Sequence, residues 1–500
     1  MNLTLAAAVA APAGNWPFVV LAVSVTFIIL AITKLRMHAF LALILAAFLA
    51  GFLTKQFAPA TIDRLPAAMR ADANANSWVA AVELTAVEFG AAAGSIAISI
   101  GLAAIIGLCL MESGGADKVV RRFLGVFGEK RAALALLTST YFLSIPIFFD
   151  TMFMLMIPLA RALRLRTGKS YLLYVMSICA AGVVTHSLTV PHPGPLAMVD
   201  NLRVDPGLSM FWGIAGGILP VFAGYFFLKW LDKRMEIPLR ETPGMTLAEL
   251  DSIATKPESA LPSFPAAVAP VLLPIILIGI GSLLKIGASS PGFISMLGGP
   301  EGFASVSKVL SFLGNKNIAL SIGAAIAMWV FARQRRMTFG QVGDSLEAPL
   351  GTAAVIILIT AAGGAFGAML RNAGVGDAIK AFAVTYSINL IILGWVTALV
   401  IRVAQGSATV AMLTTSAILW PMLDPAANAP LPFHRMYVFL AVGFGAFGMS
   451  WMNDSGFWVV SKMGGLTEKE TLKTWTLMLT VASVTGLILT FIASRILPLV

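Results

Sequence analysis

Long apolar runs alternate with short polar or basic gaps along almost the whole chain. As helices, such runs are long enough to cross the roughly 30 Å of bilayer hydrocarbon, so the pattern predicts a polytopic membrane protein. Helices are expected throughout, because a segment in lipid must satisfy its backbone hydrogen bonds within itself. The expected single spans cover residues 16–33, 39–52, 91–111, 210–229, 266–284, 318–331, 353–370 and 474–496, and residues 54–88 are expected to form an outer connection.

One polar stretch interrupts the apolar pattern at membrane depth. Residues 402–412 bring a cation, an amide, two hydroxyls and a glycine between the apolar runs 386–401 and 412–423. A bilayer tolerates such a break only where it is buried in protein or lines a wet cavity. The break predicts the tip of a re-entrant helical hairpin facing a solute, although a helix kink with Ser and Thr bonded to the preceding turn would also explain it.

The basic loops predict a second hairpin in the first half of the chain. Basic residues cluster at 118–131 and again at 161–169, and short basic loops are typical of the cytoplasmic side. The apolar run between them therefore has both ends on one side and cannot cross the membrane once. We expect residues 132–160 to enter and return, with a turn at residues 144–151, where Pro146 breaks the helix.

Two further spans are expected to be broken rather than reversed. Three prolines and a glycine within residues 191–195 cannot continue the helix that precedes them. In the second half, the polar residues 453–458 interrupt the apolar run 436–460. Each half of the chain thus holds one hairpin and one broken span.

Sequence motifs also recur in the two halves in the same order. Residues 107–117 align with 367–377, and residues 145–151 align with 405–411 at the same offset. The span count makes the first half end, and the second half begin, in the cytoplasm. We therefore expect an all-α polytopic membrane protein of two inverted repeats, each with about five spans, a re-entrant hairpin and a broken helix, which is an architecture of secondary transporters.

The inverted repeats divide the chain into three parts. We expect an N-terminal membrane repeat over residues 1–231, a cytoplasmic linker over 232–262 and a C-terminal membrane repeat over 263–500. In transporters of this kind the substrate binds near the bilayer midplane, between the two repeats.

The composition agrees with this class and excludes others. Of the 500 residues, 58% are hydrophobic and 12% are charged, about half the charged fraction of a soluble protein. The net charge of +10 comes from basic residues in short cytoplasmic loops, so we expect no nucleic-acid partner. The two cysteines lie in apolar runs and offer neither a disulfide framework nor metal-ligand spacing, and no cofactor motif is present.

Polar side chains at the breaks form the candidate site. Asp150 lies in a run of Phe, Met and Leu, and an intramembrane carboxylate is a functional candidate by default, although it would also suit the start of the second hairpin arm. His186 and His192 flank a break, where either a proton relay or a structural hydrogen bond fits. Arg402 would neutralise a substrate carboxylate, pair with Asp454 or Asp150, or extend to the membrane interface.

Small neutral donors and acceptors at the breaks are suited to reading the hydroxyl groups of a polyol, and helix N-termini there would stabilise a carboxylate. We expect proton coupling at Asp150, His186, His192 and Asp454, and substrate binding at Ser144, Thr185, Thr189, Arg402, Gln405, Ser407, Thr409, Asn453 and Ser455. No metal ligands are expected.

Several of these stretches resemble the gluconate permease family, proton-linked symporters of gluconate and related hydroxy-acids. They are IPIFFD at residues 145–150 with RTGK at 166–169, TH at 185–186, PGP at 193–195, RVAQGSATVA at 402–411, and NDSGFW at 453–458 with KTW at 473–475. The resemblance covers roughly residues 90–230 and 350–497. It implies a carrier of the bacterial cytoplasmic membrane that is usually dimeric and works by an elevator movement.

Pattern and resemblance together lead to one functional hypothesis with two alternatives. We expect proton-coupled symport of gluconate or a related small hydroxy-carboxylate, by a multi-pass protein in a lipid bilayer. Sodium coupling is the first alternative, because carbonyls exposed at the broken helices would ligate Na⁺. An intramembrane enzyme using His186 with Asp150 or Asp454 is the second, although no metal-ligand pair and no G-x-S-x-G motif supports it.

Overall fold

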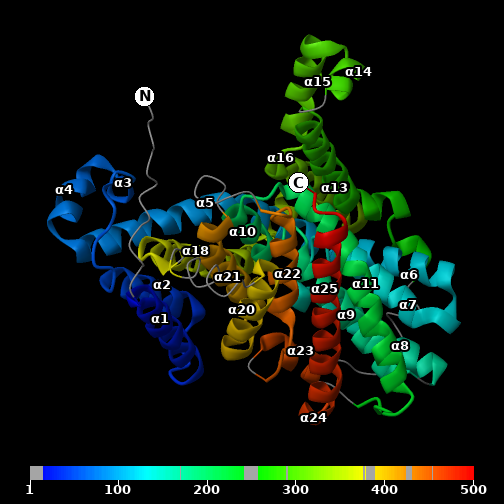
Figure 1. Ribbon diagram of the computed structural model, residues 1–500. Helices are drawn as coiled ribbons and strands as arrows, with labels where there is room; N and C mark the ends of the chain where they lie inside the picture. Colours follow the sequence, from blue (N-terminus) through cyan, green and yellow to red (C-terminus); the bar gives the residue numbers. More distant parts are fainter. Residues whose placement is uncertain are drawn as a thin grey trace.

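A computed structural model describes residues 15–168, 170–240, 257–288, 291–375, 378, 389–423, 431–452 and 454–499, and all regular secondary structure in them is helical (Figure 1). Seven helical stretches of this part are long and apolar enough to cross a membrane. They are Ser77–Glu112, Tyr171–Leu202, Pro206–Asp232, Phe264–Lys285, Lys316–Arg335, Glu347–Asn372 and Glu468–Ile496. The expected all-α membrane architecture is confirmed.

The first helices follow the apolar pattern closely, with one correction. α1 (Trp16–Thr33) and α2 (Ala39–Phe52) begin and end where the sequence predicts. The connection expected over residues 54–88 is instead partly helical, with α3 (Pro59–Ile62) and α4 (Ala67–Ala75). The long helix α5 (Ser77–Glu112) follows, and Asn76 caps its first turn by accepting a hydrogen bond from the backbone N–H of Trp78.

Two pairs of helices turn back at the predicted polar tips. α7 (Ala132–Leu143) and α8 (Phe149–Thr167) enclose the first turn, and α20 (Leu390–Gln405) and α21 (Ala408–Leu423) enclose the second. α7 is only about 18 Å long at 1.5 Å per residue, too short to cross the hydrocarbon. Gly406 adopts a left-handed conformation with φ +86°, so the chain leaves the helix there instead of merely kinking.

Two spans are broken where the prolines and polar residues predict. α9 (Tyr171–Leu188) is followed by α10 (Pro193–Leu202), and α22 (Met436–Phe447) is followed by α23 (Ser455–Met463). α8 contacts α23, and α21 contacts α10. Each hairpin therefore packs against the broken span of the other half.

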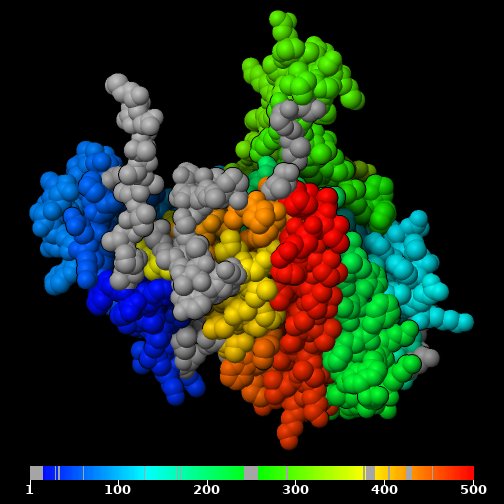
Figure 2. Space-filling view, in the orientation of Figure 1, coloured from blue at the N-terminus to red at the C-terminus, as the bar shows by residue number. Residues whose placement is uncertain are grey.

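The remaining long helices complete the core. α11 (Pro206–Asp232) packs against α25 (Leu477–Ile496), and these two helices lie side by side on the surface in Figure 2. α5 packs against α18 (Glu347–Asn372), and α9 packs against α22. Elements at corresponding positions in the two halves are thus in contact. Their opposite orientation in the membrane and the division into two repeats stay predictions.

A projecting arm begins the second half. α13 (Phe264–Gly287) and α16 (Lys316–Arg335) pair along their length, and α14 (Pro291–Met296) and α15 (Gly299–Leu313) lie at the tip of the arm, far from the other helices (Figure 1). Two short helices, α6 (Gly115–Phe127) and α17 (Phe339–Ser345), connect neighbouring spans.

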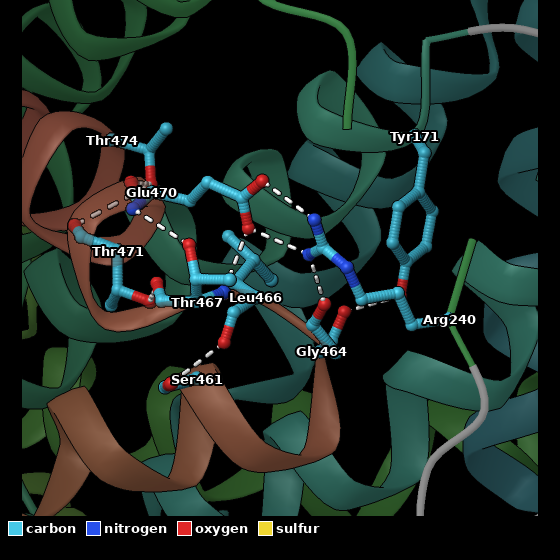
Figure 3. Close-up of polar contacts among 10 residues, drawn as sticks. Tyr171, Arg240, Ser461, Gly464, Leu466, Thr467, Glu470, Thr471 and Thr474 are labelled. Carbon is cyan, nitrogen blue, oxygen red and sulfur yellow. Dashed lines mark hydrogen bonds and ion pairs between the residues drawn. The ribbon is translucent and has the colours of Figure 1, made fainter. Parts of the chain in front are cut away.

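The predicted linker starts in contact with the second half. The guanidinium of Arg240 donates to both carboxylate oxygens of Glu470, at 2.7 and 2.8 Å, and to the carbonyl of Gly465 at 2.8 Å. Figure 3 shows this ion pair beside Tyr171, whose hydroxyl donates to the carbonyl of Gly464 at 2.8 Å. These contacts join the end of the first half to α24 (Glu468–Thr471) of the second, while residues 241–256 lie outside the described part.

Candidate substrate-binding site

A cavity of about 290 Å³ lies where the two hairpin tips meet the two broken spans. Residues from both halves of the chain line it, together with one residue of α18 and one of the π-helical segment η3 (Leu472–Thr476). The lining residues are Phe148, Phe149, Asp150, Val183, His186, Ser187, Pro193, Ile356, Arg402, Gly406, Ser407, Ala408, Thr409, Phe447, Asp454, Ser455, Gly456 and Trp475.

Four helices of the described part begin at this cavity. The first residues of α8, α10, α21 and α23 all belong to its lining. A helix N-terminus presents unpaired backbone N–H groups and about half a positive charge. Phe148 and His192, which precede α8 and α10, provide no side-chain cap. The cavity is therefore suited to an anion, and a carboxylate would find donors from both halves.

A buried ion pair ties the second hairpin tip to the second break. Arg402 donates to a carboxylate oxygen of Asp454 and to the carbonyl of Gly406, and both charged side chains are buried. Asp454 also accepts from the hydroxyl of Ser450 and, at 2.9 Å, from the backbone N–H of Gly456, so it caps α23. Of the possibilities left open for Arg402, the structure has the pairing with Asp454.

Aromatic side chains support this network from behind. The indole N–H of Trp475 donates to the hydroxyl of Ser450 at 2.7 Å, and the ring of Trp475 lies 5.5 Å from that of Phe149. Trp475 is placed by η3, an irregular turn of a kind that often occurs at functional sites. One tryptophan thus contacts the tip of the first hairpin and the partner of Asp454.

Asp150 faces the cavity differently from Asp454. Its side chain is exposed, and it has no hydrogen-bond or ion-pair partner among the described residues. Asp454 is close enough for its charge to act on Asp150. Two carboxylates thus line one small cavity, and the charge of only one of them is offset by a guanidinium.

The two histidines lie behind the first break. The rings of His186 and His192 are 4.4 Å apart, and Nε2 of His192 donates to the carbonyl of Ser144 at 2.6 Å. His186 lines the cavity, whereas His192 is buried behind it. His192 therefore holds the end of α7 against the break.

The structure brings some of the predicted residues together and separates others. Asp150, His186, Arg402, Ser407, Thr409, Asp454 and Ser455 line the cavity. The other described candidates are buried outside the lining, and they are Ser144, Thr185, Thr189 and His192. The hydroxyl of Thr189 donates to the carbonyl of Thr185 at 2.6 Å, as in a helix end stabilised by its own side chains. Asn453 and the side chain of Gln405 lie outside the described residues.

Sequence reasoning missed several lining residues, most of them apolar or small. Phe148, Phe149, Phe447 and Trp475 form apolar walls, and the hydroxyl of Ser187 is buried there without a hydrogen-bond partner in the described part of the chain. The KTW motif at residues 473–475 was the one available signal for Trp475. Apolar walls carry no distinct signal in a chain that is 58% hydrophobic.

Comparison with known proteins finds permeases that match almost the whole chain. The family described as GntP family permease matches residues 16–496. A gluconate permease of Pseudomonas aeruginosa is 32% identical over 480 residues, which are 95% of this chain and 97% of the relative. The inner membrane permease YgbN of Escherichia coli is 33% identical over 407 residues, 80% of this chain and 86% of the relative. These relatives are permeases, not enzymes.

A solved structure supports the fold. The structure of MtrF from Neisseria gonorrhoeae, described with a class of antimetabolite efflux pumps, superimposes with a TM-score of 0.61 and 16% identity. The superposition covers 91% of this chain and 94% of MtrF. The similarity concerns the fold alone.

Proposed function

This chain belongs to the GntP permease family, and on that premise we propose that it carries gluconate or a related small hydroxy-carboxylate across the membrane together with a proton. The chain is a multi-pass protein of the bacterial inner membrane. Which substrate it carries, and what drives the transport, are the subject of the proposal.

The observation that carries the proposal is the convergence of helix N-termini at one cavity. A substrate carboxylate placed there would accept hydrogen bonds from backbone N–H groups of both halves. Ser407, Thr409 and Ser455 line the same cavity and supply hydroxyl groups for the polyol part of the substrate. Phe447 and Trp475 provide apolar surface for the carbon chain.

The proton is proposed to bind Asp150. A deprotonated Asp150 would repel a substrate carboxylate in the same small cavity, since Asp150 has no counter-ion among the described residues. Protonation of Asp150 removes that repulsion, so anion and proton bind together. Release of both on the cytoplasmic side then moves one anion and one proton with no net charge.

Arg402 is proposed to have two roles: it holds the site together, and it offers a hydrogen bond to the substrate. Its guanidinium already donates to Asp454 and to the carbonyl of Gly406, so the ion pair fixes the second hairpin tip relative to the second break. Its Nε is buried and has no hydrogen-bond partner in the described part of the chain. A substrate oxygen that reaches this atom would gain a charge-assisted hydrogen bond.

Counterflow tests the substrate class independently of the driving force. Purified protein in liposomes loaded with unlabelled gluconate should accumulate labelled gluconate transiently, without any proton or sodium gradient. Unlabelled hydroxy-acids added outside should compete, while neutral polyols of the same length should not, because they lack the carboxylate. Competition by polyols as strong as by acids would contradict a site built around a carboxylate.

A further inference from the structure

A second cavity, of about 550 Å³, is lined by helices that also line the candidate substrate-binding site. α10 contributes Pro193 to the first cavity and Asn201 to the second, and α21 contributes Ala408 to the first and Trp420 to the second. α18 lines both. α10, α18 and α21 contact one another, and α5, which lines only the second cavity, contacts α10 and α18.

The second cavity lies toward the outer side of the membrane. Glu88, which lines it, precedes Glu112 in α5 by about 36 Å at 1.5 Å per residue. Glu112 pairs at 2.9 Å with Arg335, next to a basic loop typical of the cytoplasmic side. Because that separation exceeds the roughly 30 Å of hydrocarbon, an α5 that crosses the bilayer is expected to hold Glu88 near the periplasmic surface. This second cavity is called the outer cavity below.

Basic side chains outnumber acidic ones around the outer cavity. Its lining holds Arg64, Arg203 and Arg371. Two carboxylates face them, and each is within ion-pair distance of a cation: Glu88 lies 2.6 Å from Arg64, and Asp200 lies 3.7 Å from Lys316. The cavity therefore carries a net positive charge from its described side chains.

Two of the guanidiniums have no carboxylate within 4 Å in the described part of the chain. The guanidinium of Arg203 lies over the ring of Trp420, with its carbon 4.8 Å from the ring centre. Arg371 is near enough to Glu88, Arg64 and Arg203 for their charges to act on it. Guanidiniums held in this way are suited to planar anions such as carboxylates.

We infer that the outer cavity is a second binding site for the transported carboxylate, occupied before the substrate reaches the candidate substrate-binding site. The inference rests on the proposed function. A cleft with a net charge concentrates the oppositely charged solute and raises its association rate. The dipole of α10 places negative partial charge at its C-terminal end, next to Arg203, and would repel an anion there. The cations offset this negative charge.

Uptake kinetics from the periplasmic side test the inference. We would measure initial rates of labelled gluconate uptake into right-side-out vesicles holding the full-length protein, Arg371→Gln, Arg203→Gln, and Lys55→Gln as the control. Lys55 is an exposed cation between α2 and α3 that does not line the outer cavity. We expect KM to rise roughly tenfold in the two arginine variants with kcat unchanged, and no change in the control.

Salt and bound lipid separate the possible outcomes. High ionic strength should raise the KM of the wild type, but it should have a smaller effect on Arg371→Gln, and an unchanged kcat would establish that the variants are folded. Unchanged KM in both arginine variants would overturn the inference, and a loss of co-purified phosphatidylglycerol from them would then assign the cavity to a lipid headgroup. No uptake by the wild type would overturn the proposed function and this inference together.

Discussion

At the scale of single residues, the central feature is the buried pair of Arg402 and Asp454. Each side chain offsets the charge of the other in an apolar setting. Arg402 also donates to the carbonyl of Gly406 at the hairpin tip, and Asp454 accepts from the backbone N–H of Gly456 at the second break. A buried charge that loses its partner is far more costly than a pair that is absent altogether. The pair is therefore best tested by removing its members separately and together.

We predict that Arg402→Gln destabilises the protein by about 3 kcal/mol, because it leaves the carboxylate of Asp454 buried without its guanidinium. Asp454→Asn should cost a similar amount. The double variant should be more stable than either single variant, since no unpaired charge then remains. Thermal unfolding of the purified proteins in detergent measures this, and a double variant as unstable as the sum of both changes would refute the pairing.

A second prediction concerns Asp150. Asn has the shape of a protonated Asp, so Asp150→Asn should retain gluconate counterflow but lose proton-driven accumulation. Asp150→Glu is the matched control, because it keeps the titratable group and should keep part of the accumulation. Normal proton-driven accumulation by Asp150→Asn would exclude Asp150 as the proton carrier.

The sequence predicted which polar residues lie at the breaks better than it predicted which way their side chains point. An acid, a cation and hydroxyls at membrane depth stand out, and seven such candidates line one cavity. Ser144 and Thr189 were equally conspicuous but are buried away from it. Where a helix breaks, the direction of a side chain depends on the exact backbone turn. The 3.6-residue period of the helix on either side does not continue through the break, so it cannot predict that direction.

At the scale of elements, a close backbone contact joins α20 of the second hairpin to α22 of the second broken span. A Cβ atom on Gly445 of α22 would lie 2.3 Å from the carbonyl oxygen of Trp395 in α20. Backbone atoms at that distance cannot yield as a flexible side chain does. Gly445 therefore sets how closely α20 approaches α22.

We predict that Gly445→Ala lowers stability by about 1–3 kcal/mol, since the two helices must separate to admit a methyl group. Gly90→Ala in α5 is the control, because a Cβ atom there meets nothing within 4 Å. Alanine should be neutral or stabilising by up to about 1 kcal/mol at that position. Melting temperatures of both purified variants provide the comparison, and equal destabilisation would contradict the packing described.

Element boundaries followed from the apolar pattern wherever a polar or glycine signal ended a helix. α1 and α2 have the predicted ends, and both hairpin tips lie where Pro146 and Gly406 indicate. α5 was predicted too short because Glu83 and Glu88 interrupt the apolar pattern near its start, although the helix continues through both. The π-helical turn η3 has no signature in apolar periodicity.

At the scale of the whole molecule, each half completes the site of the other. Hairpin α7–α8 meets the broken span α22–α23, and hairpin α20–α21 meets α9–α10. Neither half alone supplies all four helix N-termini, so the candidate substrate-binding site exists only when both halves are folded together. The contacts of Arg240 with Glu470 tie the first half to the second at the start of the linker. The homodimer and the elevator movement that the family resemblance implies stay predictions.

The measurement that tests the central claim most directly is uptake of labelled gluconate into proteoliposomes under an imposed inward proton gradient, with no sodium present. The account predicts accumulation above the external concentration, which collapses when a protonophore dissipates the gradient. Accumulation that requires sodium and is unaffected by the protonophore would contradict proton coupling. The absence of any gluconate uptake, with either ion supplied, would contradict the proposed substrate.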